Sequence, residues 1–342
     1  MRFALTLVAA STILVACGGG GGGDDSPNPG TPSDPGTPST PSVSTQATIT
    51  PANYVAVAQQ ALSTNAFLLN ATSLVVGAQV SDSSVLVRFG QEQLSKLPGR
   101  IANAPVQAVG ATQTSTEACN GGGSLTIVEN DRNGNQQADP GDSVSLTANN
   151  CVSGSEVLNG QLTVTLTGVT GNLDGYPYTL AGTVNYQNLE AKSTTARVMA
   201  NGNMALTLSA RSDFDQDVAL AIASFAVTST YGGATSSQTL TDYSTSLKIR
   251  PAASNVNWTT SVKGTLSSTA IDAKSVSIDT PVAFVRSGNQ AYPASGQAII
   301  IGAAGTKVRI TATSATNVTI DLDADGNGSY ETTVNKAWSE IL

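Results

Sequence analysis

Histidine does not occur anywhere in the 342 residues of this chain. Its absence excludes histidine as a general acid or base, excludes Ser-His-Asp and Cys-His nucleophilic sites, and excludes histidine as a metal ligand. The G-x-S-x-G, S-x-x-K and P-loop motifs are missing too, so the serine esterase, penicillin-binding and NTPase classes lack their motifs. We therefore expect a protein that is not an enzyme.

Charged and aromatic residues are scarce. Charged side chains make up 12% of the chain, whereas a typical globular protein has about 25%. The polar surface is therefore expected to consist mainly of hydroxyl and amide side chains, as is common in secreted and cell-surface β-proteins. The net charge of −8 leaves no basic patch for phosphates, so we expect no nucleic-acid partner. Aromatic residues at 5% argue against the aromatic girdles of an outer-membrane barrel.

Long apolar runs are also missing, apart from a short one at the start. Residues 1–16 hold one basic residue, Arg2, and then an apolar run too short to span a bilayer, so they predict a signal peptide. Leu14-Val15-Ala16-Cys17 ends this segment and places small residues next to a cysteine. It resembles the lipobox of bacterial lipoproteins, in which the cysteine is acylated and becomes the first residue of the mature protein. The resemblance implies a lipid on Cys17; the alternative is an ordinary secretory signal with a chance cysteine.

The segment after the signal peptide has the composition of a tether. Residues 17–46 contain a run of glycines, Gly18–Gly23, and then a stretch rich in Pro, Ser and Thr, which is typical of flexible or extended linkers. The first aspartate comes only at Asp24. In lipoproteins of Gram-negative bacteria, an aspartate next to the cysteine retains the protein at the inner membrane. The resemblance therefore implies an outer-membrane location, on the periplasmic or the cell-surface face.

Residues 47–110 predict a lead-in of one or two helices. Thr50-Pro51 offers an N-cap and a proline at the first helical position. A second helix is expected after Asp82 and is expected to end at Pro98-Gly99, with Gly90 inside it. Apolar residues recur at helical spacing, and we expect both stripes to pack on the protein's own core, the alternative being a partner-binding face. The stripes comprise Tyr54, Val57, Ala58, Ala61, Leu62, Leu68, Leu69, Val75 and Val76 in the first helix and Leu86, Phe89, Leu94 and Leu97 in the second.

Residues 111–342 change to a period of two, which predicts an antiparallel β domain with one wet and one packed face. Asn201-Gly202 is the residue pair favoured in tight hairpins and is expected to be a turn. The fold class is therefore mainly β, with a dozen or more strands in a sandwich, a half-barrel or a long curved sheet. Alternating apolar residues mark the expected strands at 125–127, 144–146, 162–166, 178–186, 204–208, 218–222, 240–249, 262–266, 276–278, 298–301, 308–310 and 318–320.

Cys119 and Cys151 are the two cysteines that remain once Cys17 carries a lipid. If Glu129 faces Ser143 in a hairpin, the two cysteines fall nearly opposite each other. The exported compartment is oxidising, so we expect a disulfide that closes this hairpin rather than two buried thiols.

The tip of the hairpin reads DRNGNQQADPGD and resembles EF-hand and dockerin-type calcium loops. Counted as a twelve-residue loop, it places oxygen donors at positions 1, 3, 5 and 12, as Ca²⁺ requires. It departs from those families because Gln136 holds the usual glycine position and because the loop joins strands. The alternative is a polar hairpin turn. The candidate ligands are Asp131, Asn133, Asn135 and Asp142.

A second acidic loop, DLDADGNGSYETT, is the better calcium candidate. One register starts at Asp321 and puts Glu331 at position 11, whereas a register that starts at Asp323 puts Glu331 at position 9. Both resemble the isolated DxDxDG loops of extracellular β-proteins, and the alternative is a solvated acidic turn. The candidate ligands are Asp321, Asp323, Asp325, Asn327 and Glu331.

A third acidic run, Asp213, Asp215 and Asp217, has no following glycine. We therefore expect it to be the solvated start of a strand and not a cation loop.

The lipobox, the glycine tether and the C-N-G-G-G…D-x-N-x-N…G-D…N-C…N-G pattern together resemble a group of uncharacterised proteobacterial outer-membrane lipoproteins. The resemblance implies a location and a β-rich body but no activity. We expect a membrane-anchored structural or interaction domain, stabilised by Ca²⁺, with the membrane and a protein or glycan as partners. One alternative is a carrier of an apolar ligand in a curved sheet. The other is a carbohydrate-active enzyme that uses a carboxylate pair, which needs no histidine.

Overall fold

The structure is a computed structural model that describes residues 45–72, 84–103 and 112–342, except residues 174, 254 and 289. The expected signal peptide, the lipidation site at Cys17 and nearly all of the tether lie outside the described residues. The same holds for Val75 and Val76 of the first apolar stripe.

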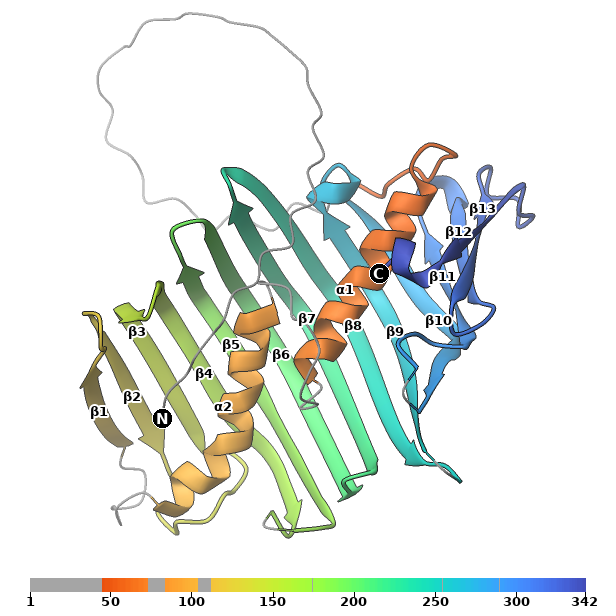
Figure 1. The fold of residues 1–342 in the computed structure, drawn as a ribbon. Coiled ribbons are helices and arrows are strands. Elements are labelled where there is room, and N and C mark those ends of the chain that lie inside the picture. Colours follow the sequence, from red (N-terminus) through yellow and green to blue (C-terminus); the bar gives the residue numbers. More distant parts are fainter. Residues whose placement is uncertain (1–44, 73–83, 104–111, 174, 254, 289) are drawn as a thin grey trace, which may run out of the picture. The chain divides into compact units, whose positions relative to one another are not determined.

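Fourteen strands form one antiparallel sheet in which the spatial order of the strands is their order in the sequence (Figure 1). The predicted mainly β, antiparallel class is confirmed, and of the expected architectures the chain adopts a single open sheet with β1 and β14 at its edges. The strands are β1 (Thr112–Ala118), β2 (Ser124–Asn130), β3 (Ser143–Ser153), β4 (Glu156–Gly171), β5 (Tyr178–Lys192), β6 (Ala196–Ser212), β7 (Asp215–Tyr231), β8 (Ala234–Pro251), β9 (Val256–Ser268), β10 (Lys274–Ser287), β11 (Ser295–Ile301), β12 (Lys307–Ala312), β13 (Asn317–Asp323) and β14 (Thr332–Ala337).

Two helices, α1 (Tyr54–Thr72) and α2 (Ser84–Asn103), cover one face of the sheet (Figure 1). α2 contacts β4, β5 and β6, whereas α1 contacts β8, β12 and β13. Most of the described side chains of their apolar stripes are buried in the same core cluster as the inward side chains of the strands, and Leu62 and Phe89 are partly buried against it. Packing on the protein's own core is therefore confirmed. Neither α1 nor α2 combines the length and the apolar character that a membrane-crossing helix needs.

The second helix does not end where we expected. α2 runs through Pro98-Gly99 to Asn103, although a proline in a helix removes one backbone hydrogen bond. Leu97 and Ile101, one turn apart on either side of this point, are both fully buried. Burial of this stripe outweighs the helix-breaking tendency of Pro98, which is why sequence alone placed the end too early.

A row of β-bulges crosses the sheet, and the bulged segments of β5, β7, β8 and β10 each lie against a glycine on a neighbouring strand. Asn150, Asn188 and Asp242 are bulge residues with positive φ. The backbone N–H groups of Asn150 and Asn188 each donate to the side-chain oxygen of a facing asparagine. A Cβ on Gly202 would lie 2.8 Å from Phe225 Cα, so only glycine allows this approach. The expected turn at Asn201-Gly202 is therefore wrong, because the pair lies in the middle of β6. The facing glycines are Gly160, Gly202, Gly264 and Gly296.

The disulfide between Cys119 and Cys151 is confirmed, with their Cα atoms 5.3 Å apart. The hairpin register behind the prediction is off by one, because Glu129 faces Val144 and Ser143 faces Asn130. Cys119 follows the end of β1, and Cys151 lies in β3 just beyond a bulge. The bond therefore joins the β1–β2 turn to β3.

Removing this bond should lower the stability of the sheet. The Cys119→Ser/Cys151→Ser double variant opens a loop whose ends are 32 residues apart, which costs about 3–4 kcal/mol in the chain-entropy account. Urea unfolding followed by circular dichroism measures the change in the free energy of unfolding. A double variant as stable as the parent would contradict the predicted stabilisation by the disulfide.

The contact between α2 and β5 gives a sharper test with an internal control. A Cβ on Gly90 would lie 2.7 Å from Val184 Cγ1 and 2.9 Å from Cζ of the buried Tyr186 ring, whereas a Cβ on Gly99 meets nothing within 4 Å. Gly90→Ala should destabilise the protein by about 1–3 kcal/mol through overpacking. Gly99→Ala should stabilise it by about 0.5–1 kcal/mol, because alanine is the better helix former. Thermal unfolding of both variants measures whether each change lowers or raises the melting temperature. A stabilising effect of Gly90→Ala would refute the close approach of α2 to β5.

Candidate metal-binding loops

The loop between β13 and β14 gathers three carboxylates. Asp323 ends β13, and Asp325 and Glu331 follow it before β14 begins. One carboxylate oxygen from each of the three lies within 4.8 Å of the others, and among the described residues this is the one such group of His, Cys, Asp or Glu. Carboxylate oxygens at this spacing are ligands for a hard cation. The loop can therefore hold a metal ion.

The loop is wrapped around Asp323, whose side chain is fully buried. Its Oδ1 accepts a hydrogen bond of 2.7 Å from the Gly326 backbone N, and its Oδ2 accepts one of 2.9 Å from the Gly328 N. Gly326 has φ of 74°, and a Cβ there would lie 2.5 Å from the Ala304 carbonyl oxygen. Glycine is therefore required where the chain turns around the carboxylate.

The other two acidic side chains of the loop are also held by backbone hydrogen bonds. Asp325 Oδ1 accepts from the Asn327 N at 3.0 Å, and Glu331 Oε2 accepts from the Ala324 N at 2.9 Å, which brings Glu331 back over the start of the loop. The Lys307 ammonium is 4.0 Å from Asp323 Oδ2. Three carboxylates share this small volume with one lysine at its margin, so a bound cation would offset their mutual repulsion.

Asp321 is not part of the group, although one register of the sequence placed it there. Its Oδ2 accepts from Arg309 Nε at 2.9 Å, and its Oδ1 accepts from the Thr333 hydroxyl at 2.7 Å. The Arg309 guanidinium also lies over the Tyr330 ring at 4.0 Å. Burial raises the pKa of Tyr330 above its ordinary value, and the charge of Arg309 opposes this. The register that starts at Asp323 is thus the one that the structure assembles.

The loop between β2 and β3 repeats the same backbone arrangement. Asp131 Oδ1 accepts from the Gly134 N at 2.8 Å, and its Oδ2 accepts from the Gln136 N at 2.7 Å. These donors lie three and five residues after the aspartate, as Gly326 and Gly328 do after Asp323. Asn133 and Asn135 then take the places of Asp325 and Asn327, each accepting from the backbone N two residues on. The two loops therefore have the same turn conformation, but they differ in the number of acidic side chains at equivalent positions.

Asp139 completes the parallel and was missed in the sequence. It lies eight residues after Asp131, just as Glu331 lies eight after Asp323, and this shared spacing was the available signal. Its Oδ2 accepts from the amides of Asn133 and Asn135 at 2.8 and 2.7 Å. These hydrogen bonds, that from Asn133 first, hold the pKa of the Asp139 carboxyl below its ordinary value.

Asp142, expected at position 12, closes the β2–β3 loop from inside the fold. It is fully buried, and its two oxygens accept from the backbone N of Arg132 at 3.0 Å and of Asp139 at 2.8 Å. The carboxylates of this loop do not meet as a group of three within the described residues. The structure therefore favours the β13–β14 loop as the cation site.

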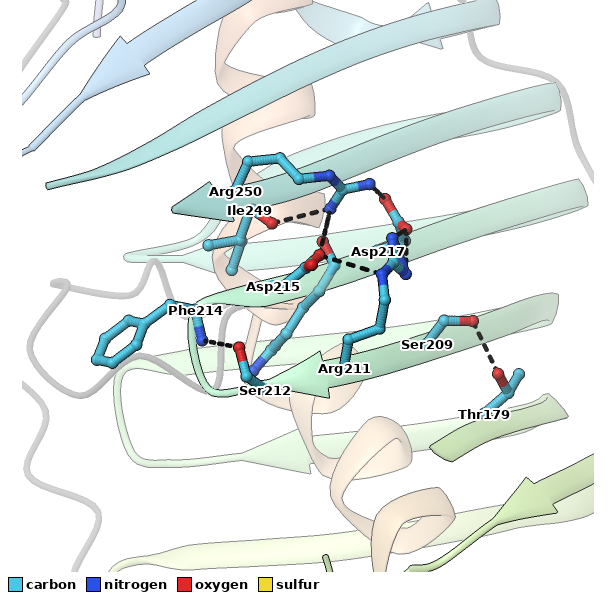
Figure 2. Close-up of polar contacts among 10 residues, drawn as sticks. Thr179, Ser209, Arg211, Ser212, Phe214, Asp215, Asp217, Ile249 and Arg250 are labelled. Atoms are coloured by element: carbon cyan, nitrogen blue, oxygen red, sulfur yellow. Dashed lines mark hydrogen bonds and ion pairs between the residues drawn. The ribbon is translucent and has the colours of Figure 1, made fainter. Parts of the chain in front are cut away.

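The third acidic run belongs to an ion-pair network at the ends of β6, β7 and β8. Figure 2 shows Arg211 and Arg250 on either side of Asp215 and Asp217. Arg250 Nη2 is 2.6 Å and Arg211 Nη2 is 2.8 Å from the Asp217 carboxylate, and both arginines also reach Asp215. Asp213 instead accepts from the Tyr176 hydroxyl, which raises the pKa of Tyr176. The run is therefore paired rather than merely solvated.

The two cation-type loops are independent of each other. In a meander whose spatial order follows the sequence, the loop after β2 and the loop after β13 leave opposite ends of the strands. No single ion can bridge them. No family model, curated protein or solved structure matches the chain.

Proposed function

We propose that this protein is a membrane-anchored, calcium-stabilised interaction module whose working surface is the face of the sheet opposite the helices. The observation that carries the proposal is the asymmetry of the sheet. Both described helices lie on one face, and the outward positions of the central strands expose small polar and alanine side chains. Among these outward positions are Thr147, Asn185, Asn203, Thr207 and Ser244.

Two alternatives find less support. An apolar carrier needs an open apolar surface, but helix residues such as Leu68, Leu94 and Leu97 are fully buried in the main cluster on the apolar face. The smaller cluster of Val218, Leu247 and Ile249 on this face is also buried. A glycosidase needs two carboxylates that flank its substrate. Asp215 and Asp217 are held by arginines, and the carboxylates of the β13–β14 loop are gathered in a turn. These arrangements support binding rather than hydrolysis.

Calcium is the cation that suits the β13–β14 loop. The donors are carboxylates and the amide of Asn327 in a short loop, and Ca²⁺ accepts many oxygen ligands in flexible geometry whereas Mg²⁺ demands a near-ideal octahedron. We expect a dissociation constant of about 10⁻⁴–10⁻³ M, as in extracellular modules. At 100 times that concentration, Ca²⁺ should stabilise the fold by about 2.7 kcal/mol.

Calorimetric titration and thermal unfolding with Ca²⁺, Mg²⁺ or EDTA test this assignment. Asp325→Asn and Glu331→Gln should each abolish the heat of Ca²⁺ binding and the rise in melting temperature. Asp139→Asn, the equivalent change in the β2–β3 loop, is the matched control and should leave both unchanged. If Ca²⁺ gives no heat and EDTA leaves the melting temperature unchanged, the calcium part of the proposal fails.

The membrane anchor is tested separately at Cys17. The mature protein from a membrane fraction should carry a diacylglyceryl thioether and an amide-linked acyl chain on this residue, seen by mass spectrometry of the N-terminal peptide. Cys17→Ser should remove the modification and move the protein out of the membrane fraction. Cys119→Ser should leave lipidation intact. An unmodified thiol at Cys17 would refute the anchor.

A further inference from the structure

A hollow of about 610 Å³ lies on the face of the sheet opposite the helices, across β5, β6, β7 and β8. Its size falls within the range of small-molecule sites, about 300–1,000 Å³. The exposed side chains that line it come from the outward positions of these four strands. Met204, Ile222 and Tyr243 also line the hollow, although their side chains are buried on the other face of the sheet.

The hollow exists because the row of bulges meets a patch of alanines. Ala205 and Ala221 face each other across β6 and β7, and Ala223 follows in the bulge of β7. The methyl groups of these alanines form the floor of the hollow. Asp242, a bulge residue with φ of 45°, places its carboxylate at the β8 side.

Three of the polar side chains around this floor have no partner in the described part of the chain. Elsewhere on the same face, hydroxyls pair across strands, as in Ser246–Ser261 at 2.8 Å and Thr179–Ser209 at 3.0 Å (Figure 2). By contrast, within the described part of the chain the side chains of Asn185, Asn203 and Asp242 form no hydrogen bond or ion pair with the protein. Unpaired amide and carboxylate groups thus lie around an alanine-floored hollow of this face.

We infer that this hollow binds a short neutral oligosaccharide. An amide offers both donors and an acceptor, and a carboxylate accepts from two groups, so together they match adjacent sugar hydroxyls. The alanine methyls offer a flat apolar contact for the C–H face of a sugar ring. Asp242 is the one charged group in the lining, and it disfavours an anionic ligand.

Two other roles, peptide binding and glycan hydrolysis, fit the geometry of the hollow less well. An extended peptide would add to a sheet edge through free backbone groups, but β5 to β8 are hydrogen-bonded on both sides. Hydrolysis of a glycan would need a carboxylate pair, and the hollow has the single carboxylate of Asp242. The inference rests on the proposed role of this face as a binding surface, and it is independent of the calcium loop and the lipid.

The test uses the full chain in a detergent without a sugar headgroup, such as lauryldimethylamine oxide. The probes are maltohexaose, cellohexaose, laminarihexaose and chitohexaose, with polygalacturonate as an acidic comparator, titrated by calorimetry. We expect at least one neutral hexasaccharide to bind with a dissociation constant between about 10 μM and 1 mM, and polygalacturonate to bind more weakly.

The variants place the ligand in the hollow. Ala221→Trp fills the floor from an exposed position and should weaken binding by at least about tenfold. Thr228→Trp, on the same strand and face but outside the lining, is the matched control and should leave binding unchanged. Asn203→Ala and Asp242→Asn, at exposed positions, should each weaken binding about three- to tenfold. These two variants keep the test decisive if Ala221→Trp fails to fold.

Several results would overturn the inference. They are the absence of neutral binding at about 10 mM sugar, a preference for polygalacturonate, or neutral binding that the hollow variants leave unchanged. Calcium binding and lipidation are measured separately. A protein that passes those tests and binds none of these sugars therefore loses this inference alone, and the proposed function stands.

Discussion

The fold depends on burying one face of a single-layer sheet. A sheet of fourteen strands has no second sheet to pack against, so its apolar face needs another cover. α1 and α2 provide that cover, and their stripes join the strands in one core cluster. Because both helices are used on this side, the opposite face is left to hydroxyl and amide side chains. The binding surface that we propose is thus a consequence of how the core is completed.

The bulge row is the second organising device. Bulges in β3, β5, β7, β8 and β10 shift the register at successive places, and glycines on β4, β6, β9 and β11 admit the extra backbone. In the bulge of β8, for example, the side chains of Thr241 and Asp242 are both on the solvent side. The same device that adjusts the sheet therefore places unpaired polar groups on its free face.

Local patterns in the sequence were reliable where one interaction dominates. The alternation of Val144 and Leu146 identified a strand because burial of one face decides its conformation, and the cysteine pair gave the disulfide despite a register error of one residue. Patterns failed where a distant contact outweighs a local preference. Asn201-Gly202 has the composition of a turn, but inside β6 the Asn201 amide accepts a hydrogen bond from the Asn188 backbone N, and Gly202 allows the close approach of Phe225 in β7.

The cation loops show the same limit. The sequence predicted Asp323, Asp325 and Glu331 as ligands, and the structure brings them together. The sequence alone could not exclude Asp321, because its position is fixed by the hydrogen bond from Arg309 of the neighbouring strand. Asp139 falls outside the twelve-residue calcium-loop pattern because its carboxylate comes at position 9, counted from Asp131. The hollow on β5 to β8 has no sequence signal, since it depends on which bulges line up across four strands.

The meander and its helices differ in how far along the chain they reach. Every strand pairs with the next strand in the sequence, so the entropic cost of closing the loop for each pairing is small. α1 and the segment before it instead contact the far end of the chain: the Ile49 N donates to Thr306 Oγ1, 257 residues away, and Gln59 donates to the Glu340 carbonyl, 281 residues away. α1 can therefore complete its packing only after the last strands of the sheet have formed. A chain that stops before β12 would leave α1 without its contacts to β12 and β13.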